Sequence, residues 1–160
     1  MFSLTTRYAL RAAVLLAELG PEDRPATVGE MAEALGIPRN YLSKTLHSLA
    51  KRGVLTSGRG PSGGFRLALP PEELALSRIV DAVEPGLCDQ ACLLGRPVCS
   101  DADPCSAHVH WRRLTGELDR FLDETTVADL VRRESAKPRP SKTAKTGGKT
   151  AGGHARRARR

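Results

Sequence analysis

The sequence lacks any apolar run long enough to cross a bilayer. Its most apolar stretch, MFSLTTRYALRAAVLLAELG at the N-terminus, is interrupted by Arg7 and Arg11, and no small-residue cleavage site of a signal peptide follows it. Membrane-spanning and secreted proteins are therefore disfavoured. We expect a cytoplasmic protein that has no membrane among its partners.

Cysteine is also scarce. The chain has four cysteines and four histidines, yet three of the cysteines and one histidine lie in CLLGRPVCSDADPCSAH, from Cys92 to His108. A chain of 160 residues can bury a core without cross-links, and cytoplasmic thiols stay reduced, so a disulfide staple is disfavoured. Structural zinc sites usually take paired C-x₂₋₄-C ligands, which only Cys88 and Cys92 provide, whereas iron–sulfur clusters accept varied spacings. Spacing alone leaves zinc and iron–sulfur both open.

Signatures of catalysis are absent too. No Ser-His-Asp order, paired-carboxylate pattern or phosphate-binding loop stands out. Gly58, Gly60 and Gly63 formally match the dinucleotide fingerprint GxGxxG, but a strand is predicted after them where that motif requires a helix. We therefore do not expect an enzyme.

Positive charge is concentrated at the C-terminus. The chain carries 25 Lys and Arg against 18 Asp and Glu, and residues 135–160 hold nine of these basic residues and no acid. The remaining residues therefore hold 16 basic and 18 acidic side chains. Because it has no apolar face, the tail is expected to be disordered, either as a solubilising segment or as a non-specific phosphate binder.

Acidic residues are missing from the whole stretch between Glu33 and Glu72. Six basic residues lie there: Arg39, Lys44, Lys51, Arg52, Arg59 and Arg66. A charge run is commonly a solvated face, but a basic stripe confined to one subregion is typical of a nucleic-acid contact.

This acid-free stretch has the pattern of a helix-turn-helix motif. Thr27 and Glu30 predict the capping box of a short helix that stops at Gly36. A second, basic helix follows and runs to Arg52, with three leucines on its inner face: Leu42, Leu46 and Leu49. Two short helices joined by a tight, glycine-containing turn are typical of DNA-binding proteins.

A hairpin is predicted directly after the second helix. Val54-Leu55 begins one strand, GRGPSGG supplies the loop, and residues 65–69 return as the partner strand. Glycines let such a wing approach a phosphate backbone, and Arg59 at its tip could enter the minor groove. The helices and the wing together give the candidate DNA contacts: Thr27, Arg39, Asn40, Tyr41, Ser43, Lys44, His47, Arg52, Arg59, Gly60 and Ser62.

The remaining predicted elements are helical. A first helix, capped by Thr5 or Thr6, runs to about Leu19, and a short helix over 77–84 buries Ile79, Val80 and Val83. A long helix from about 107 to 123 has apolar residues at steps of three, four and three: Trp111, Leu114, Leu118 and Phe121. This heptad-like stripe favours a homodimer through the long helix over a helix packed in a monomer core. Thr126 and Asp129 then cap a closing helix.

The predicted fold is therefore mainly α-helical with a small β wing. Residues 1–86 form a winged helix-turn-helix DNA-binding domain, and residues 87–108 form a cysteine-rich cluster-binding loop. Residues 109–134 form the dimerisation helix and the closing helix, and residues 135–160 form a disordered basic tail.

The order of these parts resembles a known family. LTTRYALRA, YLSKTLHSLAKRGVL, RGPSGGFRL and CLLGRPVCSDADPCSAHVHW together resemble the IscR/NsrR family of winged-helix bacterial transcription regulators, over residues 2–134. Many members of that family carry an iron–sulfur cluster. A dimer of such a helix-turn-helix protein is expected to bind a palindromic operator in double-stranded DNA.

The resemblance also implies a ligand set. Cys92, Cys99 and Cys105 fall on the three cysteines of the family, and His108 falls where some members use histidine as the fourth ligand. Six residues separate the first two cysteines here, one more than in those members. Cys88 is a rival fourth ligand. The resemblance favours a 2Fe–2S cluster over zinc, and a 4Fe–4S cluster is the second possibility.

The function implied is a transcription regulator, a repressor, that senses redox, iron–sulfur or nitric-oxide status through the cluster. Two other functions are weighed against it. One is a zinc-stabilised DNA-binding regulator that senses nothing, and the other is a redox protein that uses the cluster to carry electrons. A redox protein that carries electrons would not need a helix-turn-helix and a wing without acidic residues.

Overall fold

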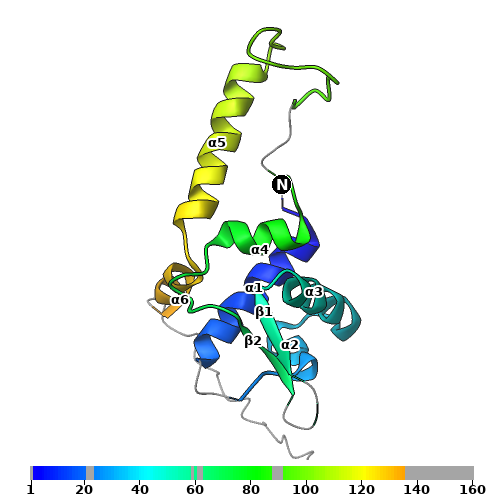
Figure 1. Ribbon diagram of the computed structural model, residues 1–160, viewed down its shortest axis with the longest axis vertical. Coiled ribbons are helices and arrows are strands. Elements are labelled where there is room, and N and C mark those ends of the chain that lie inside the picture. The colour runs from blue at the N-terminus through cyan, green and yellow to red at the C-terminus, as the bar shows by residue number, and fades with distance from the viewer. Residues whose placement is uncertain (1, 21–23, 59, 61–62, 88–91, 136–160) are drawn as a thin grey trace, which may run out of the picture.

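The structure is a computed structural model that describes residues 2–20, 24–58, 60, 63–87 and 92–135. Its elements, in chain order, are α1 (Leu4–Leu19), α2 (Val28–Leu35), α3 (Arg39–Lys51), β1 (Leu55–Gly58), β2 (Gly64–Leu67), α4 (Leu76–Val83), α5 (His108–Glu124) and α6 (Val127–Ser135). Helix α1 crosses the centre of a helical body, and α5 projects from that body as a long arm (Figure 1). The predicted fold class, mainly α-helical with a small β wing, is confirmed. Arg59, Ser62, Cys88 and residues 136–160 of the tail lie outside the described residues.

Helices α2 and α3 form the predicted helix-turn-helix. The capping box is present, because Thr27 Oγ1 accepts from the Glu30 amide while the Glu30 carboxylate accepts from the Thr27 amide. Gly36 ends α2 with a φ of 64°, a left-handed conformation that glycine adopts without strain. The three leucines of α3 are fully buried against the alanines of α1: Leu42, Leu46, Leu49, Ala9, Ala12 and Ala13. Small residues on α1 let the two helices approach closely.

The cap of α1 differs from the prediction. Ser3, not Thr5 or Thr6, is the N-cap, and its hydroxyl accepts a hydrogen bond from the Thr6 amide. Thr6 lies within the first turn of the helix, where its side chain is fully buried and donates to Glu84. The sequence suggested a threonine cap because threonine is a common N-cap residue. Only the packing of α1 against α4 shows that Thr6 lies inside the helix instead.

The wing hairpin is held by a third segment. Strands β1 and β2 pair in antiparallel register, Leu55 opposite Leu67 and Ser57 opposite Phe65. They are shorter than predicted: Val54 precedes β1, and β2 ends at Leu67 rather than at residue 69. Ala26 and Phe65 exchange both backbone hydrogen bonds, at 3.1 and 2.8 Å. These bonds fix the base of the hairpin to the segment that leads into α2.

Helices α4 and α6 close the body around α1. The helix predicted over 77–84 runs from Leu76 to Val83, with Ile79 and Val80 buried and Val83 half-buried. The chain that leads into α4 is joined to the start of α6, because the Leu76 amide donates to Thr125 and the Val127 amide donates to Leu74. The predicted capping of α6 by Thr126 and Asp129 is confirmed.

The arm α5 touches the body only at its C-terminal end. Leu122 is buried there, and Leu118 packs against the core. Of the predicted stripe, Leu114 is 59% exposed and Phe121 is 48% exposed, whereas Trp111 is half-buried. Two apolar side chains of the stripe on α5, Leu114 and Phe121, are therefore exposed to solvent. No helix in the part of the chain that the structure describes is long and apolar enough to cross a membrane.

Candidate nucleic-acid interface and metal centre

Helix α3 presents a polar face away from the core. Its leucines point inward, and five polar side chains of the helix are exposed: Arg39, Asn40, Tyr41, Lys44 and His47. Ser43 is half-buried on the same helix, and Arg52, just after it, is exposed. We call these seven residues the α3 face. No acidic side chain belongs to it, so the α3 face has the chemistry of a surface that meets phosphate and base edges.

His47 has a structural contact within this face. Its Nδ1 hydrogen-bonds the backbone oxygen of Ser43 at 2.7 Å, and its ring meets Phe65 of β2 edge-on, with centroids 5.5 Å apart. The imidazole therefore joins α3 to the wing, a contact that the sequence did not reveal. Of the predicted wing contacts, Gly60 is exposed with a φ of 93°, while Arg59 and Ser62 lie outside the described residues.

Thr27 stands apart from the other DNA candidates. It is half-buried at the N-terminus of α2, where both its backbone amide and its hydroxyl donate to Glu30 Oε2. Hydrogen bonds from Arg24 and from Thr27 lower the pKa of Glu30 to about 2. The carboxylate next to Thr27 is thus ionised and already paired with Arg24.

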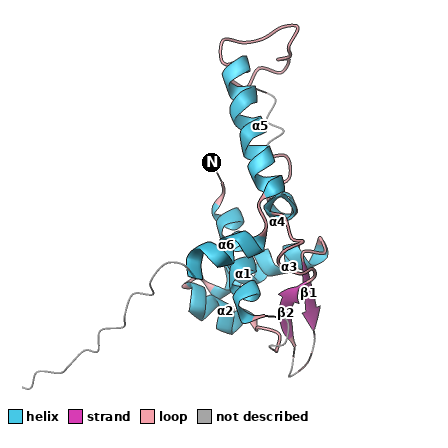
Figure 2. Ribbon diagram, turned by 90° about the vertical axis from the view of Figure 1, so that its left-hand side faces the viewer, coloured by secondary structure: helices cyan, strands magenta, loops and turns pink. Residues whose placement is uncertain are grey.

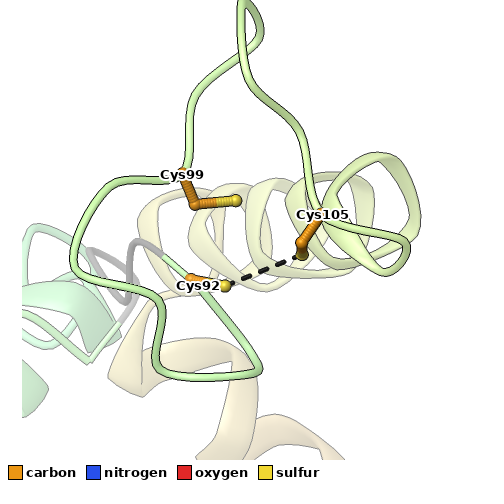
Figure 3. Close-up of side chains that lie close together, drawn as sticks. All are labelled: Cys92, Cys99 and Cys105. Atoms are coloured by element: carbon orange, nitrogen blue, oxygen red, sulfur yellow. Dashed lines mark hydrogen bonds between the residues drawn. The ribbon is translucent and has the colours of Figure 1, made fainter.

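The second group lies at the far end of α5, well away from the wing (Figure 2). The sulfurs of Cys92, Cys99 and Cys105 lie within 4.8 Å of one another, and all three side chains are half-buried (Figure 3). Two tight turns bend the loop that carries them: the Gly95 amide donates to Cys92, and Ser100 and Asp103 exchange backbone hydrogen bonds. Gly95 has a φ of 69°, which suits the first turn.

His108 completes the group. It is the first residue of α5 and is only 4% exposed. Its Nδ1 lies 3.2 Å from Cys99 Sγ, and its Nε2 lies 2.9 Å from Asp101 Oδ1. Cys92 and Cys105 form the other close pair, with 3.7 Å between their sulfurs. The structure therefore brings together all four residues that the resemblance implied as ligands, in two pairs.

The thiols of the two pairs differ in acidity. The backbone amides of Arg96 and Leu94 stabilise the thiolate and lower the pKa of Cys92 to about 7, against the opposing effect of burial. A backbone hydrogen bond from Cys105 acts in the same direction at Cys99, but burial and the neighbouring thiols outweigh it, so the pKa of Cys99 is raised. Cys92 therefore forms the thiolate that binds metal ions more readily than Cys99 does.

These donors fit a metal centre. A tetrahedral ion with metal–sulfur bonds of about 2.3 Å holds two thiolates about 3.8 Å apart, close to the Cys92–Cys105 separation. That spacing suits a single zinc ion as well as one iron of an iron–sulfur cluster, whose irons are also held by thiolates. The three cysteines form a group that could hold a metal ion, and His108 lies next to it through its contact with Cys99.

Sequence reasoning missed Asp101. It is 81% exposed, and it accepts a hydrogen bond from His108 while its other oxygen lies 3.6 Å from Arg112 Nη1. The hydrogen bond from His108, followed by the charge of Arg112, lowers the pKa of Asp101. An acid two residues after a cysteine carries no motif, so only the path of the loop could reveal this contact.

Comparison with known proteins gives a family match and similar chains over most of the sequence. Residues 2–133 match the Rrf2 family, described as "Iron-dependent Transcriptional regulator". The chain is 40% identical over 133 residues to an HTH-type transcriptional regulator of Aquifex aeolicus, covering 82% of this chain and 91% of that protein. It is 33% identical over 125 residues to the HTH-type transcriptional regulator IscR of Aliivibrio salmonicida, and the match covers 78% of this chain and 73% of that protein. CymR (YrzC), the global cysteine regulator of B. subtilis, has a similar structure, with a TM-score of 0.68 and 25% sequence identity. The match covers 83% of this chain and 97% of CymR.

Proposed function

The chain belongs to the Rrf2 family of transcriptional regulators, and we propose that it is a dimeric repressor controlled by a 2Fe–2S cluster. The family consists of DNA-binding regulators rather than enzymes. Within it, the ligands that we propose are Cys92, Cys99, Cys105 and His108. The observation that carries the proposal is the convergence of three thiols and one buried imidazole at the tip of α5.

Each ligand has a defined task in this proposal. The three thiolates supply negative charge to the irons, and the neutral imidazole of His108 replaces a fourth anionic donor, which raises the reduction potential. The cluster, when bound, supplies a one-electron couple and a lability toward oxidants or nitric oxide. The half-buried cysteines and the nearly buried histidine limit, but do not abolish, access from solvent.

The body connects the cysteine loop to the α3 face. The segment that enters the loop leaves α4, and Ser48 of α3 donates a hydrogen bond to the Ala82 carbonyl oxygen of α4 at 3.1 Å. The segment that leaves the loop is α5, whose base packs against α4. Gain or loss of the cluster is proposed to shift α4 and α5, and with them the spacing of the two α3 faces in the dimer. Different DNA affinities of the two states are all that the switch requires.

The proposed partner is a palindromic operator in double-stranded DNA, which places the protein in the cytoplasm. Each α3 face occupies a major groove, and the two half-sites lie about 10 bp or a multiple apart. The face contributes mostly exposed polar side chains, and Tyr41, at 60% exposed, is its large aromatic residue. The tail over 135–160 adds phosphate contacts without sequence preference.

Analysis of protein purified without oxygen tests the metal. We expect about two irons and two sulfides for each chain, and operator DNA whose affinity changes when the cluster is removed from the same preparation. Zinc without sulfide would support the zinc-stabilised regulator, which the 3.7 Å sulfur pair also suits. Iron and sulfide with no DNA binding in either state would support an electron carrier.

Variants of two exposed arginines test the DNA face. Arg39→Ala, on α3, should weaken operator binding by about 1–3 kcal/mol and reduce its dependence on salt. Arg120→Ala removes the same charge from α5 and should leave both unchanged. Deletion of residues 135–160 should lower affinity for all DNA equally and flatten the salt dependence. Equal effects of the two arginine substitutions would contradict the assignment of α3 as the recognition helix.

A further inference from the structure

The contact between Asp101 and His108 has a consequence for the metal centre. Asp101 lies within the tight turn between Ser100 and Asp103, and its Oδ1 lies 2.9 Å from Nε2 of His108. Asp101 comes from the exposed part of the cysteine loop, whereas His108 is 4% exposed at the start of α5. An exposed acid is therefore the hydrogen-bond partner of the outward nitrogen of a buried imidazole.

The chemistry of this pair decides which nitrogen carries the proton. An ionised carboxylate only accepts hydrogen bonds, so Nε2 must be the protonated nitrogen of His108. In a neutral imidazole the other nitrogen, Nδ1, then has a free lone pair. That lone pair faces Cys99 Sγ at 3.2 Å, on the side of the ring where the sulfurs gather. The neutral imidazole can therefore bind a metal ion through the lone pair of Nδ1.

Two acids of the loop, Asp101 and Asp103, have separate contacts. Asp103 pairs with Arg96 at 2.8 Å and exchanges backbone hydrogen bonds with Ser100. Asp101 faces His108, and its second oxygen lies 3.6 Å from Arg112 Nη1, one turn along α5. The arginine thus anchors Asp101 to the same helix that carries the histidine. This arrangement makes Asp103 a matched control for Asp101.

We propose that Asp101 is a positioning residue that selects Nδ1 of His108 as the fourth ligand atom of the metal centre. This inference rests on the proposed function, in which His108 is a ligand. Carboxylates that accept from the second nitrogen of a ligating histidine fix its tautomer and orientation and raise its basicity. Asp101 acts in this way on the Cys99–His108 pair, while the Cys92–Cys105 pair does not depend on it.

The first test uses the full chain without metal, labelled with ¹⁵N at histidine. The signals of His108 are assigned by their loss in His108→Ala. At a pH where the imidazoles are neutral, His108 should show the Nε2–H tautomer. Asp101→Ala should lose this preference, and Asp101→Asn should keep it, because the amide oxygen still accepts from Nε2–H. Asp103→Ala should leave the spectrum of His108 unchanged. An Nδ1–H tautomer in the parent, or no change in Asp101→Ala, would overturn the inference.

The second test uses the protein with its metal centre. Asp101→Ala should lose iron to a chelator roughly 10- to 100-fold faster than the parent, whereas Asp103→Ala should match the parent. The reduction potential of Asp101→Ala should rise, because a weaker donor stabilises the oxidised cluster less. Equal effects of the two alanine substitutions would contradict the inference. A protein that takes up no iron would defeat the proposed function instead, and the tautomer measurement would still decide the role of Asp101.

Discussion

The hydroxyl of Thr6, in the first turn of α1, donates a hydrogen bond to Glu84 at the end of α4, 78 residues further along the chain. The backbone amide of Ser3 donates to the same carboxylate oxygen at 3.1 Å. Since Ser48 of α3 is bonded to the Ala82 carbonyl oxygen, the end of α4 is joined to both α1 and α3. The chain leaves the body for the cysteine loop just beyond this junction.

Glu84→Gln should therefore destabilise the body. The hydrogen bonds from Thr6 and then Ser3 lower the pKa of Glu84 from its ordinary value of 4.5. A lowered pKa in the folded protein means that the ionised form adds stability above about pH 4.5, and that this contribution disappears as the pH falls through the folded pKa. We expect a loss of about 1 kcal/mol in the free energy of unfolding at pH 7.

Urea unfolding of the parent and the variant, at pH 7 and at acid pH, measures this effect. The difference between them should shrink as the pH falls. Glu18→Gln, at an exposed position of α1, is the control and should cost little at either pH. A difference between parent and Glu84→Gln that stays constant with pH would show that the charge of Glu84 is not involved.

Gly64 should be intolerant of any side chain. A Cβ there would lie 2.6 Å from the Ala26 carbonyl oxygen and 2.9 Å from the Pro25 carbonyl carbon, both backbone atoms. Gly64→Ala should therefore separate the hairpin from Ala26, at a cost of about 1–3 kcal/mol in stability. Gly58 faces Gly64 in the register, and its Cβ would meet the nearest atom at an ordinary 3.6 Å. Gly58→Ala should be tolerated in the same unfolding experiment; equal losses would show that the Ala26 contact does not limit position 64.

The body of the protein could be predicted from the sequence because its signals are local. The capping box of Thr27 and Glu30 and the leucine spacing of α3 depend on residues a few positions apart, and the structure confirms both. The α1 cap could not be predicted in the same way. Thr6 is a good cap residue by type, but its partner Glu84 is far along the chain, and only the packed fold brings them together.

Part of the candidate metal centre could likewise be predicted from the sequence, and part could not. The three cysteines and His108 could be named from their spacing and the family resemblance, and the structure brings them together. Asp101 could not, because its contact with His108 depends on the turn between Ser100 and Asp103. The bond of His47 to Ser43 and its contact with Phe65 likewise required the position of β2 relative to α3.

The apolar stripe on α5, of which Leu114 and Phe121 are exposed, should form the dimer interface. Leu114, in the middle of the arm, is 59% exposed, and burial of such a side chain contributes about 2 kcal/mol. Leu114→Lys places a charge in that interface and should shift the protein toward monomers in sedimentation experiments. Asp119→Lys, at an exposed position off the stripe, should leave the dimer intact. A monomeric parent, or equal effects of the two lysines, would contradict the assignment.

The fourth ligand can be decided by substitution at His108 and Cys88. His108 Nδ1 lies 3.2 Å from Cys99 Sγ, while Cys88 lies outside the described residues. His108→Ala should leave a labile cluster whose absorption spectrum differs from that of the parent. His108→Cys should restore occupancy and lower the reduction potential, since a thiolate stabilises the oxidised cluster. Cys88→Ala should change neither property. If Cys88→Ala instead empties the site while His108→Ala keeps the parent spectrum and potential, the ligand set is four cysteines, and the Asp101–His108 pair acts only on the shape of the loop.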